Sequence, residues 1–250
     1  MRILCTNDDG IHARGLELNI EVCAASGDVF VVAPDREQSG SSHSLTLHRP
    51  LRGMARGPQR WAVDGTPTDC AMLAVEALLP APPDVLVSGV NHGPNLGEDV
   101  LYSGTVAAAM EAVSLSVPAI AISFAGTDLD LLPTWKAPLQ RLVASILASP
   151  RLPTPIFLNV NLPPVRGDAV KGVRITTLGS RVYEGSIARM KDPWGRDIFW
   201  IGGGHINWKG SGGTTDVQAI SDGYVSVTPL QLDLTHHAGL ESARALKLEL

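Results

Sequence analysis

Short, uninterrupted apolar runs recur through the first two-thirds of the chain and alternate with stretches of helical pattern. Strands that are buried on both faces of a parallel sheet have this composition, because helices cover the two faces. The pattern therefore predicts an α/β fold around a mostly parallel sheet. The strands that it predicts are Arg2–Thr6, Val29–Ala33, Val85–Ser88, Ala119–Ser123 and Ile156–Val160.

Helices are predicted between these strands, over Thr68–Leu79, Thr105–Leu115 and Leu139–Leu147. The first has a clear beginning, since Thr66 fits an N-cap, Pro67 stands at the first helical position and Asp69 closes a capping box. Leu16–Val22 alternates apolar and polar residues with period two, as a strand would. We nevertheless predict a helix there, because the parallel strand that begins by Val29 needs a crossover before it.

The character of the sequence changes after about residue 180. Arg181–Ile187 and Asp197–Ile201 flank the β-turn signal Asp192-Pro193-Trp194-Gly195, and three of the five tryptophans gather near it. Glycine-rich segments follow at 202–204 and 210–213. These features predict a β-hairpin arm with glycine hinges, whose aromatic side chains pack on a partner subunit.

A strand over Tyr224–Thr228 is predicted to return after this arm. The chain then divides into a catalytic core (1–180), the arm with its hinge (181–216), and the returning strand with a C-terminal tail (217–250).

The composition limits the classes of function. The chain has 250 residues, 44% of them hydrophobic, with a net charge of −5 and no long basic run, so a nucleic acid polymer is not expected as a partner. No membrane partner is expected either, because the most apolar stretch, Val117–Ala125, is too short to span a bilayer. The N-terminus lacks a secretory pattern and the three cysteines are widely spaced. We therefore expect a cytoplasmic protein with reduced thiols.

The first predicted strand runs into an acidic pair, Asp8–Asp9, followed by Gly10. Ligands bind at the carboxyl ends of strands in open parallel sheets, and a turn at Gly10 lets both carboxylates converge. Adjacent carboxylates repel one another unless a cation lies between them, which indicates a metal ion. The alternative interpretation is that one of the two only caps the following helix.

Polar residues also follow the other predicted strands, and these loops are expected at the same edge of the sheet. They are Ser39 after the second strand, Asn91 and Asn95 after the third, and Ser103, Gly104 and Thr105 at the start of a helix. A helix N-terminus carries free N–H groups and a positive dipole end, which suit a phosphate. Each segment alone also fits ordinary turn or N-cap chemistry. Together they offer only oxygen and amide ligands, which favours Mg²⁺ or Mn²⁺ over zinc or copper.

Other chemistries lack their motifs in this chain. No G-x-G-x-x-G follows the first strand, and no Walker-type loop, G-x-S-x-G or H-E-x-x-H occurs. His43 and His92 fall in strand-end loops, where either is placed to assist proton transfer, although loop histidines are more often simply solvated.

With these segments the chain resembles the SurE family, the stationary-phase survival proteins that act as 5′-nucleotidases. The matching segments span nearly the whole chain in order: TNDDG (6–10), VAPD with SG (32–35 and 39–40), SLTL (44–47), GTPTDC (65–70), SGVNHGPNLG (88–97), YSGTVAAAMEA (102–112), NVNLP (159–163) and GYVSVTPL (223–230).

The resemblance implies a Rossmann-like core with helices on both faces and a C-terminal arm exchanged between subunits of a homodimer or homotetramer. It also implies hydrolysis of nucleoside 5′- and 3′-monophosphates, and in some members of short polyphosphate, with a divalent metal cation, Mg²⁺ or Mn²⁺, in each subunit. The metal ligands that it implies are Asp8, Asp9, Ser39 and Asn91. The phosphate-binding residues that it implies are Asn95, Ser103, Gly104 and Thr105. The expected catalytic residues are Asp8, Asp9, Asn95, Ser103 and Thr105.

Some alternatives stay open at this point. Asp8 or Asp9 could instead be a base or a covalent nucleophile. A non-catalytic nucleotide sensor on the same fold would keep the phosphate-binding loops but would not need the acidic pair. A phosphatase that forms an aspartyl-phosphate usually has D-x-D, whereas the acids here are adjacent.

Overall fold

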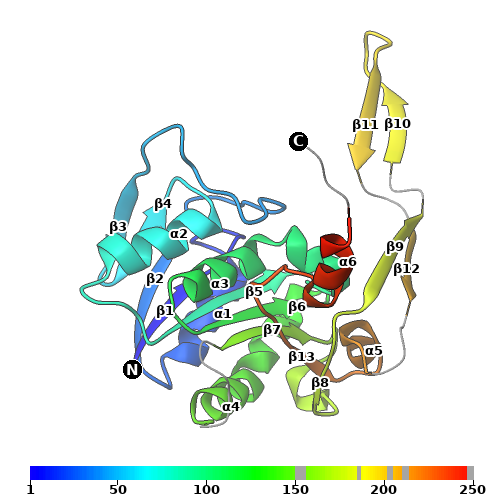
Figure 1. The fold of residues 1–250 in the computed structure, drawn as a ribbon. Helices are drawn as coiled ribbons and strands as arrows, with labels where there is room; N and C mark the ends of the chain where they lie inside the picture. Colours follow the sequence, from blue (N-terminus) through cyan, green and yellow to red (C-terminus); the bar gives the residue numbers. More distant parts are fainter. Residues whose placement is uncertain (150–155, 185–186, 202–204, 210–213, 247–250) are drawn as a thin grey trace.

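The computed structural model describes residues 1–149, 156–184, 187–201, 205–209 and 214–246 of the chain. Its centre is a nine-stranded sheet (Figure 1). The strands, in spatial order, are β3 (Gly53–Gly57), β4 (Arg60–Val63), β2 (Asp28–Pro34), β1 (Arg2–Thr6), β5 (Val85–His92), β6 (Ala119–Phe124), β7 (Phe157–Leu162), β13 (Val225–Pro229) and β8 (Val173–Ile175). The six strands from β4 to β7 run parallel, whereas β3 and β13 run antiparallel to β4 and β7.

Helices cover both faces of the sheet. On one face, α1 (Arg14–Cys23) and α4 (Lys136–Leu147) bury one hydrophobic cluster, and on the other face α2 (Pro67–Leu73) and α3 (Gly104–Ser114) bury a second. Successive strand residues point to opposite faces, so Ile3 and Cys5 of β1 enter the first cluster while Leu4 enters the second. This two-sided burial explains why the strands have continuous apolar runs, and it confirms the predicted α/β class.

Shorter helical segments join these elements. They are the π-helix η1 (Ala74–Leu78), the 3₁₀ segments η2 (Gly97–Leu101), η3 (Leu129–Trp135), η4 (Gly167–Ala169) and η5 (His237–Gly239), and the helices α5 (Asp216–Ser221) and α6 (Leu240–Arg244). The predicted helix Thr68–Leu79 is thus α2 continued by η1, and its capping box is confirmed by the reciprocal bonds between Thr66 and Asp69. Leu16–Val22 lies in α1, as the crossover argument required, with Glu17 and Glu21 exposed and Leu16, Leu18 and Val22 buried.

The hairpin β3–β4 was not predicted from the sequence. Both strands are short, β4 has only four residues (RWAV), and every residue of β3 is exposed or half-buried, so neither has the long apolar run that marks a buried strand. The pair lies at the edge of the sheet, where one face of a strand suffices for packing.

The predicted arm consists of two antiparallel strand pairs. The predicted turn forms, with the N–H of Gly195 bonded to the carbonyl of Asp192 at 2.9 Å. This turn joins β10 (Ile187–Lys191) to β11 (Asp197–Ile201), and β9 (Ser180–Glu184) pairs with β12 (His205–Lys209). The predicted β-hairpin arm is confirmed, and the predicted segment Arg181–Ile187 covers most of β9 and the first residue of β10.

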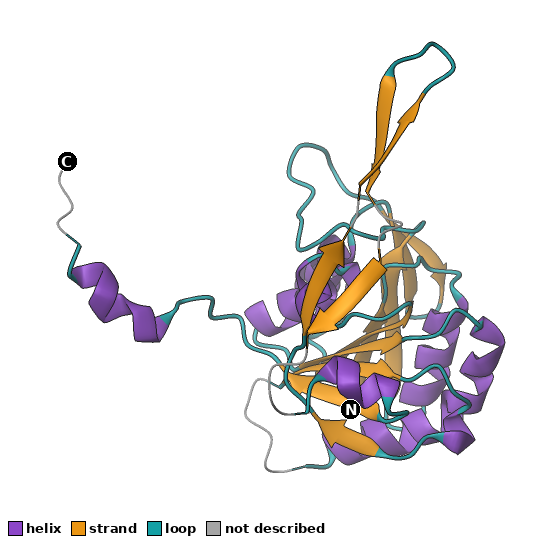
Figure 2. Cartoon of the chain, turned by 90° about the vertical axis from the view of Figure 1, so that its right-hand side faces the viewer, coloured by secondary structure: helices purple, strands orange, loops and turns teal. Residues whose placement is uncertain are grey.

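The arm projects away from the sheet in both views, and the segment with α6 extends from the body in Figure 2. The predicted glycine hinges at 202–204 and 210–213 lie outside the described residues. The predicted returning strand is β13, which enters the main sheet between β7 and β8. Over the described part of the chain, no helix is long and apolar enough to cross a membrane.

Candidate active site

Asp8 lies directly beyond the carboxyl end of β1 and is buried, with 4% of its surface exposed. The Thr105 hydroxyl donates a hydrogen bond to its Oδ1, and the backbone N–H of Gln38 donates to its carbonyl at 2.8 Å. Burial raises the pKa of Asp8 to about 6, because water no longer stabilises the carboxylate; the Thr105 bond opposes the shift and the charge of Asp9 adds to it. The ionised form of Asp8 is therefore costly in this protein.

Asp9 is the second member of the pair and is held from the end of β5. The backbone N–H of His92 donates to its Oδ2 at 3.1 Å, and Nδ1 of the His92 ring lies 3.8 Å from its Oδ1. Burial raises the pKa of Asp9 as well; His92 opposes the shift, and the nearby charge of Glu37 reinforces it. Two carboxylates at one sheet edge thus both resist ionisation.

The capping interpretation of this acidic pair is wrong. Helix α1 begins at Arg14, its N-cap residue is Ala13, and no side chain caps it. Asp8 and Asp9 instead accept bonds from α3 and β5, which are distant in the sequence.

The N-terminus of α3 packs directly against Asp8. A side chain at Gly104 would place its Cβ 2.8 Å from Cβ of Asp8 and 3.0 Å from Oδ2, so only glycine allows this approach. Ser103 is the N-cap of α3, and its Oγ accepts the N–H of Val106 at 3.1 Å. This bond uses an acceptor position and leaves the O–H of Ser103 free to donate elsewhere. Helix donors and the acidic pair therefore face the same space.

The side chains of Thr105 and Asn95, two of the predicted phosphate-binding residues, are hydrogen-bonded to other side chains of the protein. Thr105 is fully buried, and its hydroxyl donates its hydrogen bond to Asp8. The side-chain amide of Asn95 donates to Oγ of Ser123 at 2.7 Å, which leaves its second N–H for any further partner. Both residues therefore make structural contacts within the site.

Asn95 is held by a network of buried amides on β7. Its backbone N–H donates to Oδ1 of Asn161 at 2.9 Å, and its carbonyl accepts from Nδ2 of Asn159 at 2.8 Å and of Asn161 at 3.0 Å. Asn159 and Asn161 are fully buried. The NVNLP segment thus fixes the loop that follows β5, a role that its sequence alone did not indicate.

The loop after β2 forms one wall of a cleft of about 460 Å³ beside Asp9. Residues from the loops after β1, β2 and β5 line this cleft: Asp9, Gly10, Ile11, His12, Ala13, Asp35, Arg36, Glu37, Ser39 and His92. Ser39 is exposed here, and its hydroxyl donates to Oε1 of Glu37 at 2.9 Å. Glu37 was not among the predicted site residues, although it is the second acid of Asp35-Arg36-Glu37 at a strand end.

Asn91, the remaining predicted ligand, lies within β5 rather than in a loop past it. Its Nδ2 donates to the carbonyl of Gly93 at 2.9 Å, which fixes the direction of the carboxamide. A register irregularity between Ser88 and Asn91 marks this end of β5, where it pairs with β6.

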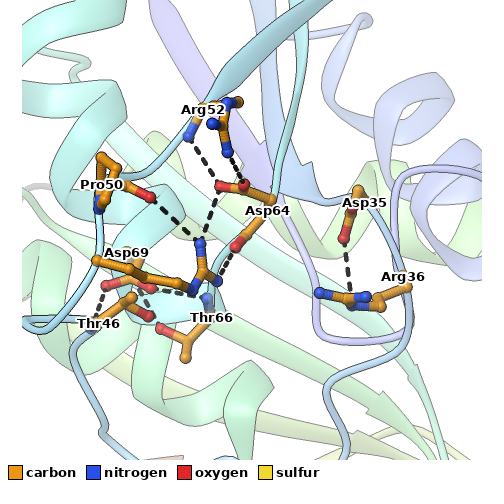
Figure 3. Close-up of polar contacts among 9 residues, drawn as sticks. Asp35, Arg36, Thr46, Pro50, Arg52, Asp64, Thr66 and Asp69 are labelled. Atoms are coloured by element: carbon orange, nitrogen blue, oxygen red, sulfur yellow. Dashed lines mark hydrogen bonds and ion pairs between the residues drawn. The ribbon is translucent and has the colours of Figure 1, made fainter.

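The segment that follows Ser39 is tied to both α2 and α3. The N–H of Ser42 bonds to the carbonyl of Tyr102 at 3.2 Å, and the ring of His43 lies 2.7 Å from the buried carboxylate of Glu111 on α3. Further along, the N–H of Thr46 donates to the capping Asp69 at 2.9 Å. Figure 3 shows this contact beside the Arg52–Asp64 pair and, separately, Arg36 against Asp35. The segment from Ser39 to Thr46 is thus restrained by several hydrogen bonds beside the site.

No group of three His, Cys, Asp or Glu side chains suited to a metal ion occurs among the described residues. A cation site built on Asp8 and Asp9 must therefore be completed by neutral oxygens, such as those of Ser39 and Asn91. The carboxylates, these neutral groups and the α3 N-terminus belong to strand ends and loops that were predicted to share one sheet edge.

The fold and the site define an α/β protein with an acidic cleft at the carboxyl edge of a parallel sheet. The family model described as "Survival protein SurE" matches residues 3–185. The chain belongs to the SurE family.

Relatives match along nearly the full length of the chain. A protein of Gemmatimonas aurantiaca named 5′-nucleotidase SurE is 58% identical, with 97% of each chain covered, and one of Geotalea daltonii with the same name is 48% identical, with 95% of each covered. The crystal structure of the SurE protein from Aquifex aeolicus superposes with a TM-score of 0.85 at 38% identity, covering 98% of each chain. The predicted family and fold are confirmed.

Proposed function

We propose that this protein is a phosphomonoesterase that hydrolyses nucleoside 5′-monophosphates with the help of a divalent cation. The names of its relatives support the substrate class. The observation that carries the chemistry is the acidic pair, in which Asp8 is buried and Asp9 half-buried, with the N-terminus of α3 packed against Asp8 through Gly104. This arrangement brings a place for a cation and a place for a phosphate to one edge of the sheet.

The residues present fit a divalent cation. Burial raises the pKa of both Asp8 and Asp9, and within the described residues neither forms an ion pair with Lys or Arg. A cation would supply the missing positive charge. We assign it to Asp8, Asp9, Ser39 and Asn91, whose oxygens suit Mg²⁺ or Mn²⁺. When bound, it supplies charge stabilisation to the phosphate and lowers the pKa of a water molecule.

The protein groups then have separate tasks. The O–H of Ser103 and the first backbone N–H groups of α3, at Gly104 and Thr105, hold phosphate oxygens, because the first turn of a helix lacks intrahelical acceptors for its N–H groups. The side chain of Thr105 orients Asp8. Asn95 shapes the loop and offers its remaining amide N–H.

These groups contact the phosphate itself, so they do not distinguish the position on the sugar to which it is attached. We therefore include 3′-monophosphates and short polyphosphate among the proposed substrates. The non-catalytic sensor remains the rival function, and it has no use for the costly acidic pair.

We also propose that the protein self-associates through its arm, as a homodimer or homotetramer. The β10–β11 hairpin exposes Trp194 at 78%, Trp200 at 64%, Phe199 at 60% and Ile201 at 87%. Aromatic side chains of this kind are enriched at subunit interfaces. Light scattering of Trp200→Ser against the wild type tests the assignment: a smaller assembly supports it, and an unchanged mass contradicts it.

The experiment that tests the function is phosphate release from a panel of nucleoside monophosphates. The protein is first treated with a chelator, then assayed alone and with Mg²⁺ or Mn²⁺, with a generic aryl phosphate as the control substrate. Release that requires the cation and favours nucleotides supports the proposal. Folded protein that releases no phosphate with any cation would favour the sensor.

A further inference from the structure

Asp216 is a carboxylate that the proposed chemistry does not use. It is the first residue of α5 and is fully buried. Its Oδ2 accepts the backbone N–H of Gly97 at 2.8 Å, and its Oδ1 accepts those of Gly179 at 2.7 Å and Val217 at 2.8 Å. A buried carboxylate that accepts backbone N–H groups from two distant segments, besides that of its own neighbour, holds those two segments in fixed relation.

The first of these segments belongs to the active-site loop. Gly97 begins η2, which runs to Leu101 and is followed, after Tyr102, by Ser103 and the start of α3. Two residues before Gly97 stands Asn95, whose backbone is held by Asn161. Asp216 and Asn161 thus fix neighbouring points of the segment that leads into the phosphate-binding helix N-terminus.

The second segment is the base of the arm. Gly179 immediately precedes β9, and a side chain there would lie 2.8 Å from Val217 and 3.0 Å from Oδ1 of Asp216. The next residue, Ser180, donates from its hydroxyl to Oε1 of Glu98 at 3.0 Å. The arm therefore begins beside Glu98, the neighbour of the Gly97 that Asp216 holds.

Helix capping does not account for these contacts. Thr215 is the N-cap of α5, and its Oγ1 accepts the N–H of Gln218 at 3.3 Å. An aspartate in the first turn also interacts favourably with the helix dipole. That role needs no contact with Gly97, which is far away in the sequence.

We propose that Asp216 is a positioning residue, which locks the segment from Asn95 to Ser103 to the base of the arm and so sets the phosphate-binding groups. The proposal rests on the function assigned above, since it takes Ser103 and the α3 N-terminus as the phosphate site. Through Asp216, the placement of the arm becomes part of the geometry of that site.

The test compares Asp216→Asn with Thr215→Ala in the full-length protein. The asparagine keeps the shape but replaces one acceptor oxygen with a donor, so the bond to Gly97 or to Gly179 is lost. The Thr215 variant weakens the same helix and leaves both bonds in place. Both are compared at a temperature where circular dichroism shows them folded.

We expect Asp216→Asn to lower kcat/KM for a nucleoside monophosphate by up to about 100-fold, as a small misplacement of binding groups does. Calorimetry should also show weaker binding of inorganic phosphate in the presence of Mn²⁺. Thr215→Ala should match the wild type in both measurements. Equal effects of the two variants, or none in Asp216→Asn, would overturn the proposal.

A second variant provides a test if Asp216→Asn does not fold. Gly179→Ala pushes on Asp216 from the arm without changing any charge, and should weaken phosphate binding in the same direction. An unchanged phosphate affinity in this variant would equally overturn the proposal. The phosphate titration also separates the two hypotheses: if the wild type binds phosphate but hydrolyses no nucleotide, only the function fails, and the variants still decide the role of Asp216.

Discussion

In the absence of metal, Asp8→Asn should become more stable relative to the wild type as the pH rises. The same change removes Asp8 as a proposed ligand of the cation. The carboxylate is buried, and burial raises its pKa from 3.8 to about 6. The native state therefore binds the Asp8 proton more tightly than the unfolded state does. Stability of the wild type must consequently fall as the pH rises through this window, from near 4 to above 6.

The size of the effect follows from the shift. Each pKa unit corresponds to about 1.4 kcal/mol, so the shift at Asp8 costs the native state about 3 kcal/mol once the group is fully ionised. Asparagine carries no such charge, although its amide has a desolvation cost of its own. That second cost is the same at every pH. The free energy of unfolding of Asp8→Asn minus that of the wild type should therefore rise by about 2 to 3 kcal/mol between pH 4 and pH 7.5.

Urea denaturation in the presence of a chelator, at four pH values from 4 to 7.5, measures this difference directly. Asp9 is present in both proteins, so its own titration largely cancels. Adding Mn²⁺ at pH 7.5 should then stabilise the wild type and leave Asp8→Asn unchanged, because only a ligand bound by the native state raises its stability. Parallel pH curves for the two proteins would refute the reasoning.

Three other changes test separate parts of the site. Asp9→Asn should abolish turnover without changing the circular dichroism spectrum, and near-normal activity in the folded variant would contradict the assigned role. Asn161→Ala leaves the N–H of Asn95 without its buried acceptor, so urea denaturation should show a loss of about 1 to 3 kcal/mol; an unchanged midpoint would count against the amide network. His43→Ala removes the partner of the buried Glu111 carboxylate and should cost a similar amount, about 1 to 3 kcal/mol, with His43→Gln recovering part of it; equal stability of the two variants would show that the pairing is unimportant.

The main sheet could be predicted because its strands carry their signal locally. A strand buried on both faces must be apolar throughout, as Val29–Ala33 is within β2, and the need for a parallel crossover corrected the misleading alternation at Leu16–Val22. The same rule, that parallel strands end at one edge, predicted that the loop with Asp8 and the start of α3 lie at the same edge of the sheet, and Gly104 does pack against Asp8. Where a strand is polar and lies at an edge, as β3 does, this signal is missing.

The residues that hold the site in place by hydrogen bonds could not be predicted in this way. Thr105 was expected to face a phosphate but donates to Asp8, a contact that depends on how closely α3 approaches β1. Asp216 bonds to Gly97 across 119 positions of the chain, and Asn161 to Asn95 across 66. Hydrogen bonds of this range arise from the packing of distant segments and leave no periodic pattern in the sequence. An aspartate after a threonine at a helix start indicates only the first turn of a helix.

The residues that hold the site in place and the acidic pair have opposite effects on the stability of the protein. Asp8 is ionised at a cost in its buried position, whereas Asp216, Asn159 and Asn161 satisfy backbone groups of the loops around it. A carboxylate that resists ionisation needs rigid surroundings, since a mobile loop would open and let water reach it. The loop that contains Asn95 is accordingly bonded from β6, β7 and α5 at once, through Ser123, Asn161 and Asp216. Under the proposed function, this distribution keeps an unfavourable charge in place until a cation offsets it.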